Sequence, residues 1–419
     1  MVMRLISIFA IILFVNTTTI TSVAASNSLQ LSPDAEISLL TCSPGKEIYS
    51  LFGHSAVRVN DPVLGLDIVF NYGTFDFDTP HFHLKFMQGQ LLYKLTVSTM
   101  EQFVQEYYYT GRAVYEQVLN LNMEETQRLF DFMMVNRLPE NAYYLYDFFF
   151  DNCATRIRDL ADSLLYVVWA DDRAISPEII GPIRSKLDYS FYYTPDPKYN
   201  RSFRDLLHPF LENVPWLRFG IDLILGMPSD RVAHPFEFMY LPDEMLIAFA
   251  RASLKNGNPL VSEHRIILRK RVVQEPSGIF TPSVVFWAIF ILAIISLAIP
   301  KISRIFDLTF FNLLGFAGIV IFFLWFFSDH GATKNNLNIL WALPTHLYFI
   351  WRAKYNDNRM FIKIYFRSVV IIALILLVSW PIIPQGLHPA FFPIILTVLI
   401  KSAAYAFRIP YITDKLTTA

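Results

Sequence analysis

The chain has 419 residues, and 35 lysines and arginines stand against 36 aspartates and glutamates, so the formal charge is −1. This balance excludes a broad nucleic-acid-binding surface, which requires an excess of basic side chains. Hydrophobic residues make up 54% of the chain and charged residues only 17%, a composition typical of a membrane protein. With two cysteines, the chain can be neither a disulfide-rich scaffold nor a four-cysteine zinc protein.

Residues 1–25 have the pattern of a secretion signal. Arg4 supplies a positive charge, Leu5–Val15 is apolar, and the small residues Val23–Ala25 permit cleavage before Ser26. The alternative is an uncleaved anchor helix. Cleavage is favoured because the apolar stretch is shorter than the ~20 residues that span a membrane.

The segment from residue 26 to residue 280 is expected to form a folded extracytoplasmic domain, because its charges are interspersed and it is long enough to bury a large core. Within it, Ala56–Val59 alternates as a strand does, and Leu66–Gly73 is a second candidate strand. The two are predicted to pair as a hairpin. His54 then lies at or near the start of a strand, directly after Gly53, which permits a tight turn.

A second segment predicts a helix that begins beside a cysteine. Asp151 or Asn152 is a suitable N-cap, and helical spacing of apolar residues continues from residue 154 to residue 165. Cys153 would lie in the first turn, where backbone N–H groups and the helix dipole lower the pKa of a thiol. A nearby imidazole would favour the thiolate further. The alternatives for Cys153 are a small buried hydrophobic residue or half of a disulfide with Cys42.

A membrane domain of about five spans is predicted over residues 281–408. The candidate spans are Thr281–Pro300, Leu308–Ser328, Leu337–Trp351, Ser368–Pro384 and Leu387–Phe407. The third is short and contains Pro344, so a tilted or re-entrant segment is the alternative there.

Basic residues set the orientation of these spans. Lysine and arginine gather in Lys301–Asp307, in Arg352–Arg367 and after the last span, whereas the alternate connections contain only Lys334. With five spans, the three basic segments fall on one side, which is expected to be the cytoplasm. Residues 409–419 would then form a cytoplasmic tail, and residues 26–280 would lie outside the cytoplasmic membrane, as the signal also indicates.

Several motifs together resemble the Lnb family of bacterial lipoprotein N-acyltransferases. They are the run Leu39–Val59, the strand Asn71–Gly73 and the run Phe150–Arg156. The segment Asp329–Thr333, followed by Asn336, Asn338, Leu340 and Trp341, is similar to the membrane half of Bacteroidetes-type members. The resemblance extends from about Leu39 to Phe407.

This resemblance implies a fold and a reaction. The extracytoplasmic domain would be an α+β, circularly permuted papain-like domain, similar to lecithin–retinol acyltransferase. Cys153 would be the nucleophile and His54 its general base, with Asn71 as the residue that orients the imidazole and Tyr72 as the alternative. An acyl chain would pass from a diacylglyceryl ester to Cys153 as a thioester, and then to the α-amino group of a lipoprotein's N-terminal cysteine. No cofactor is expected.

Other residues are weaker candidates. Arg156, Tyr72, His330 and Asn336 are expected to contribute to substrate binding; the alternatives are a solvated helix face for Arg156 and helix-end caps for His330 and Asn336. Cys42 is expected to be a free thiol, because a bond to Cys153 would block the nucleophile. A metal at His81 and His83 is not expected, since no third ligand is placed by the sequence.

The expected partners are diacylated lipoproteins or phospholipids as substrates, together with the lipid bilayer itself. Two rival functions remain open. One is a papain-like cysteine peptidase or amidase that acts on the cell envelope, and the other is a non-enzymatic membrane assembly factor. A transporter is disfavoured because the spans lack paired charges and an evident inverted repeat.

Overall fold

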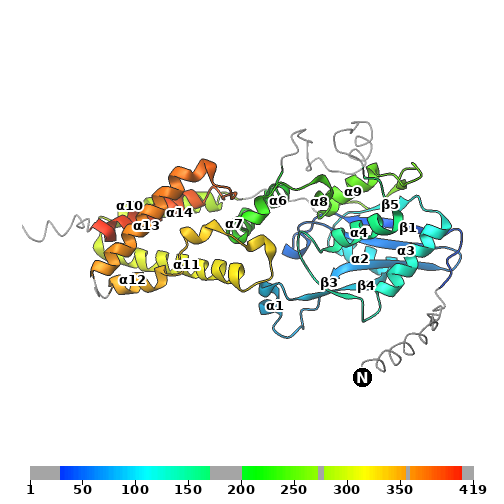
Figure 1. Cartoon of the computed structure of the whole chain (residues 1–419), viewed down its shortest axis with the longest axis horizontal. Helices are drawn as coiled ribbons and strands as arrows, with labels where there is room; N and C mark the ends of the chain where they lie inside the picture. Colours follow the sequence, from blue (N-terminus) through cyan, green and yellow to red (C-terminus); the bar gives the residue numbers. More distant parts are fainter. Residues whose placement is uncertain (1–28, 170–200, 272–277, 355–358, 408–419) are drawn as a thin grey trace, which may run out of the picture.

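The structure is a computed structural model that describes residues 29–169, 201–271, 278–354 and 359–407. The predicted signal segment and cytoplasmic tail lie outside the described residues. An α+β domain and a helical region follow one another along the long axis of the molecule (Figure 1).

The α+β domain is built on one antiparallel sheet with strand order β6-β4-β3-β2-β1-β5-β7. Its strands are β1 (Glu36–Cys42), β2 (His54–Asp61), β3 (Leu66–Thr74), β4 (Leu92–Thr99), β5 (Val114–Leu119), β6 (Tyr143–Leu145) and β7 (Val261–Leu268). β2 and β3 pair as the predicted hairpin, and His54 is the first residue of β2, as predicted.

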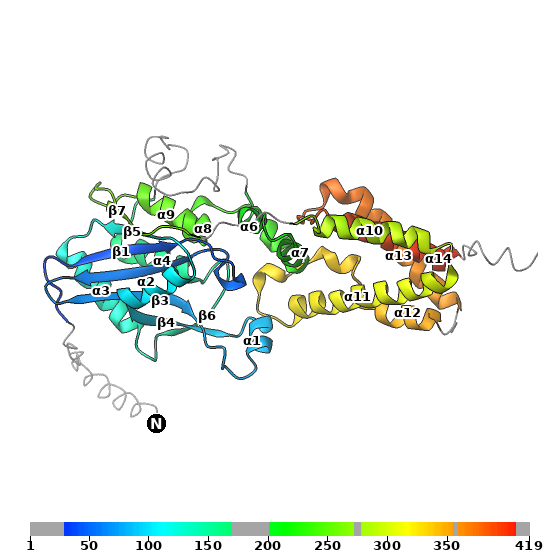
Figure 2. The same ribbon diagram turned by 180° about the vertical axis from the view of Figure 1, so that it is seen from behind.

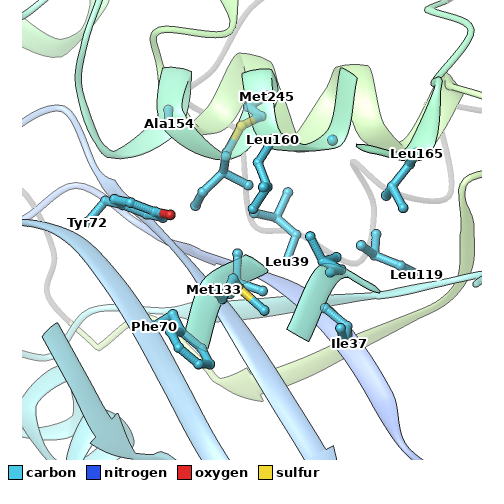
Figure 3. Packing of buried hydrophobic residues seen from close by; sticks show 14 of the residues in the cluster. Ile37, Leu39, Phe70, Tyr72, Leu119, Met133, Ala154, Leu160, Leu165 and Met245 are labelled. Atoms are coloured by element: carbon cyan, nitrogen blue, oxygen red, sulfur yellow. The ribbon is translucent and has the colours of Figure 1, made fainter. Parts of the chain in front are cut away.

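Helices cover both faces of this sheet. The helices of this domain are α1 (Phe82–Gln88), α2 (Met100–Tyr109), α3 (Met123–Asn136), α4 (Cys153–Leu165), α6 (Phe203–Leu211), α7 (Pro215–Ile224), α8 (Pro235–Phe238) and α9 (Pro242–Arg251), with the short 3-10 turns η1 (Ile48–Ser50) and η3 (Met227–Asp230). One face packs against α3, α4 and α9 through residues such as Leu39, Phe70 and Leu160 (Figure 3). The other face packs against α2. Burial of each large side chain contributes about 1.5–3 kcal/mol.

The predicted cysteine helix is confirmed as α4. The side chain of Asn152 accepts hydrogen bonds from the N–H groups of Ala154 and Thr155, both at 2.9 Å, and so caps the helix. The buried side of α4 includes Ile157 and Leu160, which face the sheet. Cap and stripe together fix the position of Cys153, the first helical residue.

The helical region contains α10 (Pro282–Ser296), α11 (Pro300–Phe326), α12 (His346–Lys354), α13 (Arg359–Ser379) and α14 (Phe391–Phe407), with the turns η4 (Gly331–Thr333), η5 (Leu337–Leu340) and η6 (Trp380–Ile382). Two of its helices, Pro300–Phe326 and Met360–Ile382, are long and apolar enough to cross a membrane; α10 and α14 are apolar but shorter. A helical membrane region is therefore present.

The third predicted span is not one continuous helix. Leu337–Leu340 is a 3-10 turn, and α12 begins only at His346. Pro344 disfavours helical geometry in the residue before it and lacks an N–H group, so the helix starts after it.

The ends of the helices show which side of the region faces the α+β domain. After α11, the N–H of Asp329 donates to the carbonyl of Gln88 at 2.7 Å. Between α13 and α14, the N–H of Gly386 donates to Asp230 at 2.9 Å. Lys301 and Arg304 lie in the first two turns of α11, at its opposite end, so the predicted connection Lys301–Asp307 is part of this helix. This arrangement agrees with the orientation expected from the basic residues.

A buried ion pair joins three helices at that opposite end. The Lys401 ammonium on α14 lies 2.8 Å from a carboxylate oxygen of Asp307 on α11. It also donates to the hydroxyls of Ser296 on α10, at 2.7 Å, and Ser303, at 2.8 Å. Charged groups persist in such surroundings only when they are paired and hydrogen-bonded, so the cluster holds the three helices in one register. The expectation that the spans lack paired charges is therefore wrong at this position.

Candidate functional site

β2 and β3 separate at the end of the sheet that carries His54. Their paired register runs from Asp61 opposite Leu66 to Val57 opposite Phe70. In β3, the register with β4 then shifts between Asn71 and Thr74. Irregularities of this kind change the direction in which side chains point, and they are common beside active sites.

The imidazole of His54 is held across this gap. Its Nε2 lies 3.0 Å from the amide oxygen of Asn71. With the amide oxygen as acceptor, Nε2 carries the proton and Nδ1 is the nitrogen left to act as a base. Asn71 is thus in the position that was predicted for the residue that orients the imidazole.

The thiol of Cys153 lies in the same gap. The backbone N–H groups of Ser55, Ala154 and Cys153 itself lie near the sulfur and favour its thiolate form. Gly73 borders Cys153: its φ of +92° favours glycine, and a Cβ built on it would be in ordinary van der Waals contact, 3.6 Å, with the Cβ of Cys153. Backbone N–H groups near a sulfur can stabilise a thiolate, and they can also stabilise an oxyanion that forms beside it.

The structure therefore brings the two predicted segments together, since Ser55 directly follows His54. Both side chains are half-buried. Among the described residues, no hydrogen bond joins the thiol of Cys153 to the imidazole of His54. The functional pairing of the two side chains stays a prediction, and Ser55 is the structural link between them.

Burial favours the neutral forms of both groups. Burial lowers the pKa of His54 to about 4, although the hydrogen bond to Asn71 opposes this shift. Burial also raises the pKa of the Cys153 thiol, although the three N–H groups and the charge of Arg112 oppose it. The arrangement suits a base that removes the thiol proton during attack, rather than an ion pair that is already formed.

Arg112 affects this site through its charge, which lowers the pKa of the Cys153 thiol; the sequence did not reveal this role. Its guanidinium is buried, its Nε donates to the carbonyl of Ser43 at 2.7 Å, and it lies 4.6 Å from the ring centre of Tyr107. Its Nη2 is buried and has no hydrogen-bond partner in the described part of the chain. A buried cation of this kind favours negative charge nearby. Nothing in the local spacing of residues 107–112 indicates such a role.

We expect Arg112→Gln to move the reactivity of Cys153 toward higher pH. The arginine charge lowers the pKa of this thiol, so its removal raises the pKa and decreases the thiolate fraction at a fixed pH. At any pH below the pKa, a thiol whose pKa is higher by one is alkylated about 10-fold more slowly. The measurement is the rate of iodoacetamide alkylation between pH 7 and pH 10. Arg112→Lys, which keeps the charge, should remain close to the wild type; identical profiles for all three proteins would contradict the prediction.

The two other candidates near the site have partners of their own. Arg156 forms an ion pair with Asp151 and lies 3.9 Å from the ring centre of Tyr144. Tyr72 is 2% exposed within the core, and its hydroxyl accepts a hydrogen bond from Asn136 at 2.7 Å. It is therefore Asn71, and not Tyr72, that contacts His54.

His330 and Asn336 lie at the junction with the helical region. The Nε2 of His330 donates to the carbonyl of Phe86 at 2.8 Å. The buried amide of Asn336 donates to the carbonyl of Leu223 at 2.8 Å and accepts from Gln385 at 3.1 Å. In this structure both residues hold loops of the helical region against the α+β domain.

The second cysteine is separate from the first. Cys42 and Cys153 are both free thiols, as expected. Cys42 faces α2, on the sheet face opposite α4, and burial raises its pKa to about 12. Among the described residues, no group of three potential metal ligands is present.

Comparisons with known proteins agree with this layout. Residues 25–170 match the family model described as the Lnb N-terminal periplasmic domain, and residues 274–410 match the model described as the Lnb transmembrane domain. Searches of curated proteins and of solved structures find no match. The two matched segments cover well over half of the chain and leave residues 171–273 between them.

Proposed function

The chain belongs to the Lnb family of inner-membrane proteins with a periplasmic N-terminal domain, and from that premise we propose that it is a lipoprotein N-acyltransferase. It would move an acyl chain from a diacylglyceryl ester to the α-amino group of a lipoprotein's N-terminal cysteine. The observation that carries this proposal is the thiol of Cys153, which lies among three N–H groups beside the hydrogen-bonded pair of His54 and Asn71.

The domain limits belong to the same proposal. Residues 1–25 would be the signal, 26–280 the periplasmic catalytic domain, 281–408 a membrane domain of about five spans, and 409–419 a cytoplasmic tail. The catalytic domain would be a permuted papain-like fold. The chain order supports this, because the strand with His54 precedes the helix with Cys153.

In the first half-reaction, Nδ1 of His54 removes the thiol proton and the sulfur of Cys153 attacks an ester carbonyl carbon. The oxygen of the tetrahedral intermediate lies near backbone N–H groups of the gap, with Arg112 as a source of positive potential. The C–O bond of the ester then breaks, and the departing alcohol takes the proton from His54. The acyl chain remains on Cys153 as a thioester.

In the second half-reaction, the α-amino group of the lipoprotein attacks the thioester carbonyl, and His54 removes a proton from the nitrogen. The C–S bond breaks, and the thiol of Cys153 is restored. An amide is more stable than the ester that is consumed, so the transfer proceeds without ATP or a cofactor.

Water must be kept away from the thioester, because otherwise the enzyme would act as a lipase. The residues before Cys153 are aromatic: Phe148, Phe149 and Phe150 pack with Tyr240 and Phe203. They supply an apolar wall on the approach to the thiol. Attachment to the membrane adds a high local concentration of lipid esters.

The test uses the purified full chain in phospholipid nanodiscs with a synthetic diacylated lipopeptide that has a free α-amino group. If the chain moves within one molecule, the lipopeptide keeps its mass, while fragmentation shows an N-acyl amide and one lost ester. An isotope-labelled phospholipid donor would instead add its labelled chain. A cleaved peptide bond would indicate the rival peptidase, and an unmodified lipopeptide would remove the acyltransferase proposal.

A further inference from the structure

An apolar segment projects from the sheet between β3 and β4. It comprises residues 75–91, including α1, and is called the β3–β4 excursion here. Several of its large side chains face solvent: Phe77 is 66% exposed, Phe86 51%, Leu84 48% and Met87 38%. A soluble surface seldom gathers so many apolar side chains in one short segment, and such patches mark contacts with proteins or membranes.

The excursion lies beside the outer end of a membrane-spanning helix. Within a few residues of the end of α11 at Phe326, Asp329 donates its N–H to the carbonyl of Gln88 at 2.7 Å, and its carboxylate accepts from Gln90 at 3.1 Å. His330 donates to the carbonyl of Phe86 at 2.8 Å. Both views place α1 next to the loop that follows α11 (Figures 1 and 2).

The apolar surface of the excursion continues onto α11. Phe322, Phe326 and Phe327, in the last turn of that helix and directly after it, are 43%, 56% and 61% exposed. The bilayer covers the apolar helices of this region, so its outer boundary lies near these side chains. The excursion also carries His81, His83 and Lys85, residue types that suit the phosphate level of a membrane surface.

The same segment leads directly to the candidate site. β3 contains Asn71, which holds His54, and Gly73, which borders Cys153; it ends at Thr74, where the excursion begins. The chain re-enters the sheet at Leu92. One continuous stretch of backbone thus connects the outer end of α11 with the gap that holds the thiol.

We propose that the β3–β4 excursion inserts its apolar side chains into the outer leaflet of the inner membrane, and that lipid substrate passes along it to Cys153. The membrane contact is independent of the reaction that the site catalyses. The delivery of substrate rests on the proposed acyltransferase function.

The contact is tested with an NBD label on Leu84→Cys, in full-length protein that also carries Cys153→Ala and is reconstituted in nanodiscs with doxyl-labelled phospholipid. Cys42 is buried and does not compete for the label. The label should show blue-shifted emission and strong quenching by the lipid. The control is Val63→Cys, which is 64% exposed in the turn between β2 and β3, at the other end of the sheet. Equal quenching at the two positions would overturn the proposal.

Delivery is tested with Leu84→Glu in the nanodisc assay, with Val63→Glu as the matched control. Acyl transfer should fall about 10-fold or more, a loss of at least about 1.4 kcal/mol, while iodoacetamide still alkylates Cys153 at the wild-type rate. Unchanged transfer in Leu84→Glu would overturn the delivery role. If the wild type itself transfers no acyl chain, the acyltransferase proposal fails. The quenching of the NBD label still shows whether the β3–β4 excursion contacts the membrane.

Discussion

Cys153→Ala is expected to abolish acyl transfer to below detection, and His54→Ala to slow it by about 10²- to 10⁴-fold. Alanine at position 153 removes the sulfur that holds the acyl chain in this mechanism, so the proposed thioester cannot form. Alanine at position 54 leaves the thiol without a base, and burial already raises the pKa of that thiol. The measurement is N-acylation of a lipopeptide by full-length protein in nanodiscs, with mass spectrometry of the acylated Cys153 peptide.

Cys42→Ala is the matched control, because Cys42 lies on the opposite face of the sheet and should keep most of the wild-type rate. Retained transfer in Cys153→Ala would reject this mechanism whatever the control shows. If Cys42→Ala lost transfer while Cys153→Ala kept it, Cys42 and not Cys153 would be the nucleophile.

Asn71→Ala is expected to have a smaller effect, about 10-fold on the rate. The amide holds the imidazole but takes no part in bond making, so its loss should add little once His54 has been replaced. The rates of Asn71→Ala, His54→Ala and the double variant form the cycle that measures this coupling. Fully additive losses would show that Asn71 acts independently of His54.

The parts of the site that could be predicted depend on local signals. Alternation predicted the hairpin of β2 and β3, and a suitable cap followed by helical spacing predicted α4 with Cys153 in its first turn. These features need only neighbouring residues, so one sequence suffices. The gap between β2 and β3 beyond Val57, and the shifted register near Asn71, result from pairing across three strands, which no local pattern specifies.

Arg112 was missed for the same reason. Its position follows from a hydrogen bond to Ser43, which is 69 residues away, and from the pairing of β5 with β1. In the membrane region, apolar composition predicted a helix at α11 and at α13, but α11 begins at Pro300 and not at Leu308, and α13 begins at Arg359 and not at Ser368. Apolar composition did not distinguish a span from the segment around Pro344, where apolar side chains belong to two turns and a short helix.

The residues between the two matched family segments contain a cluster of ion pairs that connects the α+β domain to the helical region. This cluster, called the joint here, is centred on Arg204, Asp222 and Asp230. Arg204 is 2% exposed and forms ion pairs with Asp222 at 3.0 Å and Asp230 at 2.7 Å. Asp230 in turn accepts from the N–H of Gly386 at 2.9 Å, where a Cβ would collide with both ionic partners. The carbonyl of Asp222 accepts from Asn338 at 3.1 Å. One buried guanidinium thus organises contacts from the α+β domain to two loops of the membrane region.

We therefore expect Arg204→Ala to destabilise this joint by about 3–5 kcal/mol, since it leaves two carboxylates without their buried cation. Hydrogen exchange of the amides in residues 201–230 measures the free energy of local opening. The control is Arg231→Ala, whose ion pair with Glu237 is half exposed and contributes at most about 1 kcal/mol. Equal exchange in the two variants would show that the joint does not depend on Arg204. If the joint depends on Arg204, acyl transfer by Arg204→Ala in nanodiscs should fall while alkylation of Cys153 stays unchanged. The gap between β2 and β3 lies outside the joint, so the variant loses only the position of this gap over the membrane.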